Sequence, residues 1–289
     1  MGGKECIFNL NLAFLDSDDA ALAADPGYPP YTGGPWLSGS EAVLMPLVPE
    51  LGFAPDLDAI GAADRERAKL LYLNYPNNPT GAVAPDGLFE RAVEFARRHD
   101  VLIVHDASYT EVTFDGYVAP SFLQTPGALG VGVEVLSLSK GWNMTGWRTG
   151  AIVGNADAVE AYWRLKTNLD SGMFEAVQLA AVAALEECRD FPAQMSAVYA
   201  RRRDLVCDAL EAIGVTVTRP KATIYVWAPV PKGHTSASYC ELVLEESGVV
   251  LSPGSAYGPN GEGFFRISLT VADERLVEAV ERLRASLGG

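Results

Sequence analysis

The amino-acid sequence predicts an α/β fold: a large domain with a mostly parallel sheet in an α/β/α sandwich, followed by a smaller C-terminal α+β domain. Short, nearly continuous apolar runs at 68–75 and 101–106 are typical of parallel strands that are buried on both faces. The segment between them, 85–100, has the spacing of an amphipathic helix. After about residue 190 this alternation ends, so we predict a large domain over 1–190 and a small domain over 191–289.

The first half of the chain is expected to supply most of the large sheet. A helix is predicted over 4–15, where acidic residues follow it, and the short apolar run 20–24 then leads into the turn-rich segment DPGYPPY. Strands are predicted at 42–48, 68–75, 101–106, 131–139 and 149–154. The helix over 85–100 has a proline near its start, which is a favoured position.

The second half changes character after Gly154. Residues 156–188 form a long helical region that is interrupted near 167–172, and the Phe-Pro pair at 191–192 breaks it. The remaining elements are expected to be a helix, short strands at 215–218 and 223–230, another helix, strands at 248–251 and 264–270, and a closing helix.

The composition narrows the class of protein. The chain has 289 residues, enough for two domains, and its formal net charge of −15 disfavours nucleic acid and anionic membranes as partners. No apolar run reaches the roughly 18 to 20 residues needed to span a bilayer. The cysteines Cys6, Cys188, Cys207 and Cys240 are widely spaced and form no ligand pattern, so we expect no metal site and buried free thiols in a reducing cytoplasm.

Polar residues gather where the predicted parallel strands end. These residues are Asn78, Asp106, Ser137, Ser139 and Lys140, with Arg148 close behind the lysine. In open α/β sheets the carboxyl ends of the strands meet at one edge, and ligands bind there. A buried carboxylate and a buried amine near an arginine would suit an anionic, electron-withdrawing cofactor.

Four stretches carry a resemblance to a known family. NYPNNPTG, HDASYTEVTFDG, SLSKGWNMTGWRTG and FFRISLT resemble, in the same order, the motifs of the fold-type-I, pyridoxal-phosphate-dependent aminotransferases of class I/II. The resemblance extends over essentially the whole chain. Within that family, DPGYPPYTGG, KTNLDSGMF and KATIYVWAPVPKG are most similar to the LL-diaminopimelate aminotransferase group.

The resemblance implies a catalytic role for three residues. Lys140 would be joined covalently to the aldehyde of pyridoxal 5'-phosphate (PLP) and, once released by substrate, would carry the α-proton. Asp106 would pair with the ring nitrogen and keep it protonated, so that the ring withdraws electrons. Tyr109, together with Asn78, would donate a hydrogen bond to the phenolic oxygen of the ring.

The remaining site residues would bind the phosphate and the ring of the cofactor and the carboxylate of the substrate. The resemblance implies that Ser137, Ser139 and Arg148 bind the cofactor phosphate, together with backbone N–H groups of Gly3 and Lys4 at the start of the first helix. Two further assignments concern the ring and the substrate. Tyr28 would stack on the cofactor ring, and Arg266 would bind the α-carboxylate of the substrate as a bidentate pair.

The function implied is transfer of an amino group between an amino acid, LL-diaminopimelate in first place, and a 2-oxo acid such as 2-oxoglutarate, in lysine biosynthesis. Several alternatives stay open at this point. One is an aspartate, alanine or methionine aminotransferase, or a carbon–sulfur lyase, on the same scaffold. The other is a non-catalytic aminotransferase-like module.

The sequence departs from the family pattern at two places. Ser108 stands where the family usually has alanine, close to the cofactor. Family members also carry a segment before the glycine turn at Gly2 and Gly3, so we expect this chain to be truncated at its N-terminus. The full-length family is homodimeric, with an active site completed across the dimer. We therefore expect these 289 residues, made alone, to be aggregation-prone or weakly active.

Overall fold

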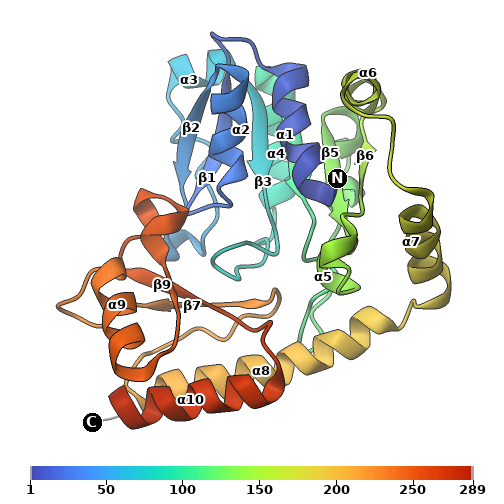
Figure 1. The fold of residues 1–289 in the computed structure, drawn as a ribbon. Helices are drawn as coiled ribbons and strands as arrows, with labels where there is room; N and C mark the ends of the chain where they lie inside the picture. Colours follow the sequence, from blue (N-terminus) through green and yellow to red (C-terminus); the bar gives the residue numbers. More distant parts are fainter. Residues whose placement is uncertain (1, 288–289) are drawn as a thin grey trace.

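Two sheets organise the computed structural model, which describes residues 2–287 (Figure 1). The larger sheet has six strands in the order β2-β1-β3-β4-β5-β6. Its strands are β1 Ala20–Asp25, β2 Glu41–Pro46, β3 Ala68–Leu73, β4 Leu102–Asp106, β5 Gly132–Ser137 and β6 Gly150–Gly154. Every neighbouring pair is parallel except β5 and β6, which are antiparallel. The predicted α/β class with a mostly parallel sheet is confirmed.

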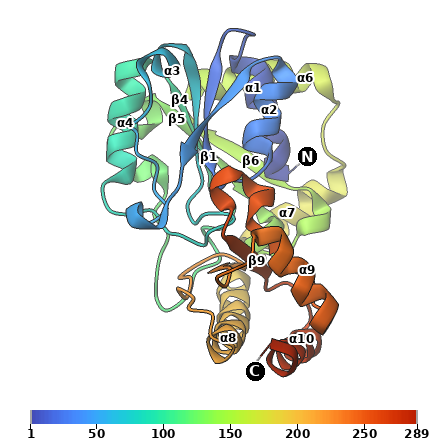
Figure 2. The same cartoon turned by 90° about the vertical axis from the view of Figure 1, so that its left-hand side faces the viewer.

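Helices cover both faces of the large sheet because its central strands are apolar on both sides. Along β3, Leu70 and Tyr72 pack into one cluster, whereas Leu71 and Leu73 pack into the other. The first face is covered by α1 Gly2–Phe14, α2 Pro30–Ser38 and α6 Ala156–Leu169. On the second face, α4 Leu88–His99 supplies most of the apolar side chains, and the short α3 Ala62–Arg67 lies nearby (Figure 2).

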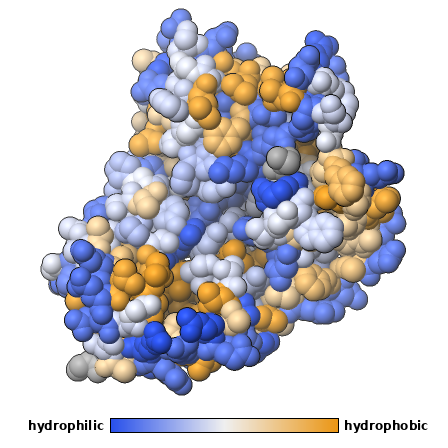
Figure 3. Space-filling model, viewed as in Figure 1, coloured by the Kyte–Doolittle hydropathy of each residue, from blue (hydrophilic) through white to orange (hydrophobic). Residues whose placement is uncertain are grey.

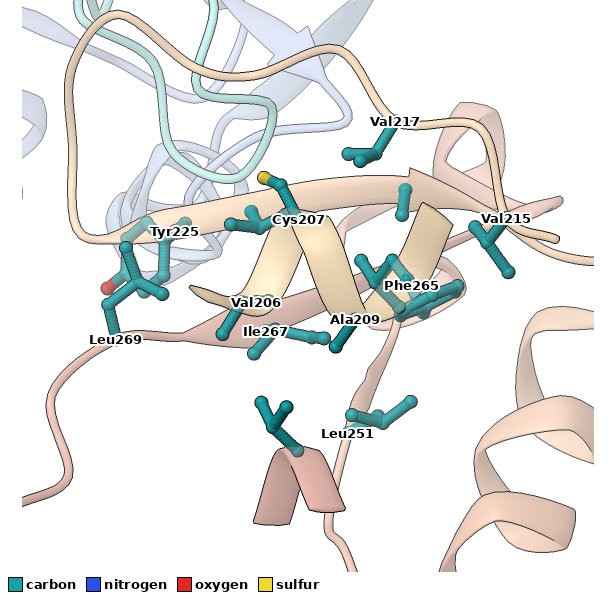
Figure 4. Packing of buried hydrophobic residues seen from close by; sticks show 14 of the residues in the cluster. Val206, Cys207, Ala209, Val215, Val217, Tyr225, Leu251, Phe265, Ile267 and Leu269 are labelled. Atoms are coloured by element: carbon teal, nitrogen blue, oxygen red, sulfur yellow. The ribbon is translucent and has the colours of Figure 1, made fainter. Parts of the chain in front are cut away.

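The second sheet is small and antiparallel, in the order β7-β9-β8. It consists of β7 Tyr225–Pro229, β8 Ser252–Pro253 and β9 Phe264–Ser268. The helices around it are α8 Phe191–Ala212, α9 Ser236–Ser247 and α10 Asp273–Leu287. Figure 4 shows Val206 and Cys207 of α8 among the side chains of Phe265 and Ile267 in this core. The small sheet thus has a hydrophobic cluster of its own, in addition to the two clusters on the faces of the large sheet.

The connection between the two parts runs through α7 Glu175–Glu187, which lies between α6 and α8 in the sequence. The break predicted at 191–192 corresponds to the start of α8, where Pro192 occupies the first turn. The proposed division at residue 190 falls just before this helix. As a boundary between independent domains it stays a prediction.

Three expectations from the sequence were wrong. Residues 215–218 form no strand, although Val215 and Val217 are buried alternately, because no neighbouring strand pairs with them among residues 2–287. The strand expected at 248–251 lies slightly later and is only two residues long. Cys188 is exposed, unlike the other three cysteines, because it ends α7 at the surface.

The sequence analysis also missed two elements. The run AALAAD forms β1, a fully buried internal strand of the large sheet. The segment PYTGGPWLS forms α2, despite two prolines and two glycines. Neither element has the length or the period that marks a strand or helix in isolation. Within residues 2–287 no helix is both long enough and apolar enough to cross a membrane.

Candidate active site

A cavity of about 420 Å³ lies at the carboxyl ends of the large-sheet strands, where the small sheet faces them. In Figure 3 hydrophilic residues gather in the middle of the molecule, between its upper and lower parts. The cavity is lined by every site residue that the sequence singled out: Gly3, Lys4, Tyr28, Asn78, Asp106, Tyr109, Ser137, Ser139, Lys140, Arg148 and Arg266. The fold therefore brings together residues from both sheets and from α1.

The charge of the cavity is opposite to that of the molecule. Its lining contains four cations, Lys4, Lys140, Arg148 and Arg266, and one carboxylate, Asp106. The chain as a whole has a formal charge of −15. A local excess of positive charge in a concave site concentrates anions there. The cavity is thus suited to ligands that carry phosphate or carboxylate groups.

Asp106 is held by three donors at the end of β4. Its Oδ2 accepts a hydrogen bond from the Tyr31 hydroxyl at 2.8 Å. Its Oδ1 accepts from the backbone N–H of Ser108 at 3.1 Å and from the Ser108 hydroxyl at 2.5 Å. These hydrogen bonds satisfy both oxygens of the buried carboxylate and restrict its rotation.

Lys140 lies where β5 turns into the short helix α5 Leu138–Gly141. Ser137 caps this helix, because its Oγ accepts a hydrogen bond from the backbone N–H of Ser139 at 3.2 Å. Among residues 2–287 no hydrogen bond or ion pair engages the Lys140 amine. Lys140 is half-buried and lines the cavity.

One end of the cavity combines an arginine with a helix N-terminus. Gly2 begins α1 with a φ of +69°, and a Cβ at that position would lie 2.7 Å from Nη2 of Arg148. The guanidinium of Arg148 therefore packs against the start of α1, and its Nη1 donates to the Thr145 carbonyl at 2.7 Å. Two positive groups side by side are unfavourable unless an anion lies between them. Together with the Ser137 and Ser139 hydroxyls, they form a phosphate-binding end.

Lys4 and Gly3 belong to the same end of the cavity. The side chain of Lys4 turns toward the Phe8 ring, with its Nζ 5.9 Å from the ring centre. A Cβ at Gly3 would lie 3.1 Å from Cγ1 of Val135, so the helix start fits closely against β5. For this reason the backbone of both residues, rather than the Lys4 side chain, is the part that suits a phosphate.

Tyr28 and Tyr109 both line the cavity. The Tyr28 ring lies edge-on to Tyr31, with ring centres 5.7 Å apart. Tyr109 is buried, and its hydroxyl donates to the Tyr225 hydroxyl at 3.3 Å. Burial, with the charge of Asp106 as a smaller contribution, raises the pKa of Tyr28, and burial raises the pKa of Tyr109 well above its usual value.

Arg266 enters the cavity from β9. Its guanidinium lies between the rings of Tyr225 and Tyr257, at 3.9 Å and 4.7 Å from their centres. Its Nη1 donates to Oδ1 of Asn78 at 2.9 Å, which links the small sheet to the end of β3. The Nε is buried and has no hydrogen-bond partner among residues 2–287. An unpaired buried donor beside a cavity is a further reason to expect a carboxylate ligand.

The sequence analysis missed several residues of the site. Asn74 donates to the Asp106 carbonyl at 2.7 Å, and its Oδ1 accepts from the N–H of Asn78 at 2.8 Å, so it ties the ends of β3 and β4 together. Its position near the end of the predicted strand 68–75 was a usable signal. Tyr31 and Tyr225 lie in the quoted stretches DPGYPPYTGG and KATIYVWAPVPKG, but no local pattern gave either residue a role. Tyr257 lies outside the quoted stretches.

PLP, the cofactor that the resemblance implies, fits this set of residues. A phosphate suits the Arg148 end, and a pyridine nitrogen suits the carboxylate of Asp106. The aldehyde suits the amine of Lys140, and the flat ring suits the face of Tyr28. The orphaned donor of Arg266 remains for a substrate carboxylate.

Comparison with known proteins agrees with this geometry. Residues 1–283 match the family described as aminotransferase class I and II. The chain is 52% identical over 288 residues to the LL-diaminopimelate aminotransferase of Moorella thermoacetica, covering 100% of this chain and 74% of that protein. For the protein of the same name from Desulforudis audaxviator the identity is 54% over 288 residues, with the same coverage. The substrate-bound structure of BacF from Bacillus subtilis superposes with a TM-score of 0.94 at 38% identity, covering 100% of this chain and 74% of that one.

Proposed function

Because this chain belongs to the class I and II aminotransferases, a PLP-dependent family, we propose that it moves the amino group of LL-diaminopimelate to a 2-oxo acid such as 2-oxoglutarate, in lysine biosynthesis. The observation that carries this proposal is one cavity that combines the Lys140 amine, the Asp106 carboxylate and the cations Arg148 and Arg266. The choice of amino donor is supported by the names of relatives that are 52% and 54% identical.

We propose that Lys140 forms the covalent link to the cofactor and moves the proton of the substrate. When bound, PLP supplies an aldehyde for that link and a ring that withdraws electrons from the substrate α-carbon. Lys140 lies in the last turn of α5, and its amine would serve as the base that takes the substrate proton. The Asp106 carboxylate would hold the ring nitrogen, and Tyr109 and Asn78 would hold the phenolic oxygen of the ring.

The two ends of the cavity bind anions with different tasks. At one end Arg148, Ser137, Ser139 and the first N–H groups of α1 retain the phosphate throughout the reaction. At the other end Arg266 binds the α-carboxylate of each amino acid and oxo acid in turn. Because every substrate of a transaminase has this carboxylate, one arginine serves both half-reactions.

A panel of amino donors tests the assignment. Each donor is incubated with the protein, PLP and 2-oxoglutarate, and formation of glutamate is measured. LL-diaminopimelate is expected to have the highest kcat/KM. A preference for aspartate, alanine or methionine would support the rival aminotransferases. Release of a thiol from a sulfur amino acid without any oxo acid would support a lyase, and cofactor binding without turnover would support a non-catalytic module.

We propose in addition that the enzyme works as a homodimer. Large apolar side chains are exposed on and around α6 and α7: Trp163, Leu169, Phe174, Leu179, Val182 and Leu185. Helix α7 stands at the margin of the molecule beside α5, which carries Lys140 (Figure 1). The Trp142 indole N–H donates to the Ala184 carbonyl at 3.0 Å, so this face is tied directly to the site. A second copy of the chain would cover it.

Sedimentation tests the dimer. The double variant Leu179→Arg, Val182→Arg is expected to sediment as a monomer, because two charges would be buried at the interface. The matched control Val277→Arg, at an exposed position of α10, should leave the sedimentation coefficient unchanged. A wild-type protein that is monomeric at all concentrations would contradict the proposal.

We also propose a cytoplasmic location. The four cysteines are free in the structure, and Cys188 is exposed, which is the pattern of a reducing compartment. Cell fractionation followed by detection of the protein would test this, and recovery in the membrane or secreted fraction would contradict it.

A further inference from the structure

The Asp106 carboxylate is supported from both sides by residues to which the proposed function gives no role. On one side the Tyr31 hydroxyl donates to Oδ2 at 2.8 Å, and on the other the Ser108 hydroxyl donates to Oδ1 at 2.5 Å. Tyr31 is 1% exposed and Asp106 is 4% exposed. A buried carboxylate without such donors is costly, and it returns to the neutral acid or turns away.

Tyr31 is fixed in place by the rings around it. It stacks on Tyr72 with ring centres 5.1 Å apart and an angle of 14° between the rings. It also meets Tyr28 edge to face at 5.7 Å. The hydroxyl group thus has one position available. Tyr31 bridges the tyrosine that faces the cofactor ring and the carboxylate that faces its nitrogen.

Tyr31 remains a donor at every working pH. Burial, the Asp106 charge and the hydrogen bond to Asp106 together raise the pKa of Tyr31 well above its usual range. A phenol that keeps its proton can only donate to a carboxylate. Ser108 likewise donates from both its hydroxyl and its backbone N–H, so one oxygen of Asp106 receives two hydrogen bonds and the other receives one.

We propose that Tyr31 and Ser108 are positioning residues that hold the Asp106 carboxylate turned toward the ring nitrogen of the cofactor. This inference rests on the proposed function, because it assumes that the cavity binds PLP. The single hydrogen bond on Oδ2 leaves a lone pair of that oxygen for the ring nitrogen.

The test compares two ligands in each variant. One is PLP, and the other is its analogue with carbon in place of the ring nitrogen, which cannot bond to Asp106 through that atom. Dissociation constants are measured by absorbance titration with the wild type, Tyr31→Phe, Ser108→Ala and the double variant. The ratio of the two constants reports only the interaction at the ring nitrogen, because a general loss of folding or of phosphate binding affects both ligands alike.

The wild type is expected to prefer PLP to the analogue. Tyr31→Phe keeps the ring that stacks on Tyr72 but removes the donor, so the preference should fall by about tenfold, the effect of losing a hydrogen bond to a charged group. Ser108→Ala should lower it less, because the Ser108 N–H still donates. The double variant should lower it more than either single change.

The matched control is Tyr75→Phe. Tyr75 is also a buried phenol with one hydrogen bond, to the Phe53 carbonyl at 2.6 Å, but it packs into the cluster on the other face of the sheet. This variant should leave the preference unchanged. A preference that is unchanged or larger in Tyr31→Phe, or one that falls equally in Tyr75→Phe, would overturn the inference.

The outcomes separate the two proposals. If the wild type binds neither ligand, the proposed function fails. If the wild type prefers PLP but Tyr31→Phe and Ser108→Ala keep that preference, only the positioning role fails. Should Tyr31→Phe not fold, Ser108→Ala carries the test alone, because alanine is the usual residue of the family at this half-buried position.

Discussion

At the scale of single residues, Arg266 shows why a flat guanidinium, and not an ammonium group, suits the substrate end of the cavity. Its guanidinium is flat, it fits between the rings of Tyr225 and Tyr257, and it still reaches Asn78 through Nη1. An ammonium group would keep the charge but lose the stacking and the second nitrogen that a carboxylate requires.

Arg266→Lys is therefore expected to raise KM about tenfold or more for the amino acid and the oxo acid alike, because bidentate binding and stacking are lost. The affinity for PLP should stay unchanged, since Arg266 lies at the substrate end. Steady-state kinetics and cofactor titration measure the two effects. As a control, Arg275→Lys alters an exposed arginine paired with Glu278 and should change neither. Unchanged KM values in Arg266→Lys would contradict the assigned role.

A second residue acts on stability instead of catalysis. Glu134 of β5 accepts hydrogen bonds from His105 Nδ1 at 2.9 Å, from the Ser121 hydroxyl at 2.8 Å and from the Phe122 N–H at 2.6 Å. Burial alone would raise the pKa of the Glu134 carboxyl, but these hydrogen bonds outweigh burial and hold it below the ordinary value of 4.5. The charged form is thus the one that the fold stabilises.

The sign of the pH effect follows from the lowered pKa. The stabilisation by Glu134 is complete above the pKa of the unfolded chain and is lost as the pH falls through the lower, folded pKa. Glu134→Gln should reduce the free energy of unfolding by about 1 to 3 kcal/mol at pH 7, and the deficit should shrink below about pH 4. Urea unfolding at the two pH values measures it. Glu90→Gln, on the exposed side of α4, is the control, and a deficit that grows in acid would refute the account.

At the scale of elements, the start of α1 determines the phosphate end of the cavity. Gly2 has a φ of +69°, and Arg148, with a φ of 56°, packs its guanidinium against it. The helix end and the arginine therefore occupy adjoining positions only because residue 2 lacks a side chain.

Two glycine substitutions separate strain from function. Gly2→Ala and Gly39→Ala both place alanine at positive φ, so each should cost roughly 1 kcal/mol of stability. A Cβ at Gly39 meets nothing within 4 Å, whereas one at Gly2 would displace the Arg148 guanidinium. Only Gly2→Ala should weaken PLP binding, by about tenfold, as measured by absorbance titration. Equal affinities in the two variants would show that Arg148 does not need this contact.

At the scale of the whole molecule, a buried carboxylate joins the two sheets. Asp25 ends β1 and accepts a hydrogen bond at 2.6 Å from Nδ2 of Asn260, which lies in the turn Pro259–Gly261 between β8 and β9. The Gly27 N–H donates to the Tyr257 carbonyl at 2.9 Å alongside it. Since Tyr257 also packs against Arg266, this contact links the carboxyl end of β1 to the substrate end of the cavity.

Asn260→Ala is expected to lower the free energy of unfolding by about 1 to 3 kcal/mol, because the buried Asp25 keeps only backbone donation from residue 260. It should also raise KM for substrate more than the dissociation constant of PLP. Denaturant unfolding and kinetics measure these effects. Ser255→Ala, an exposed change in the neighbouring turn, is the control. An equal change in KM and in cofactor affinity would show that the contact has no special link to Arg266.

The sequence predicted the parts of this molecule that depend on local pattern. The apolar runs that form β3 and β4 are buried on both faces, so most of their residues are hydrophobic and the strands stand out. Asp106 ends β4, and Asn78 and Lys140 follow β3 and β5 within a few residues. The rule that parallel strands end at one edge was enough to bring the three together.

What the sequence did not reveal depends on contacts between distant segments. β1 consists mostly of alanines, which have no strand preference, and it is a strand because β2 and β3 pair with it. Residues 215–218 have the alternation of a strand but pair with no strand within the described range 2–287. Tyr31 contacts a residue 75 positions away, and no local pattern marks such a contact.

The central claim is that the Lys140 amine is the group that binds the cofactor covalently. The protein is incubated with PLP, treated with borohydride to make the link permanent, digested and analysed by mass spectrometry. The account predicts that the peptide containing Lys140 carries the reduced cofactor and that Lys140→Ala carries none. An unmodified Lys140, with the label on another lysine, would contradict it.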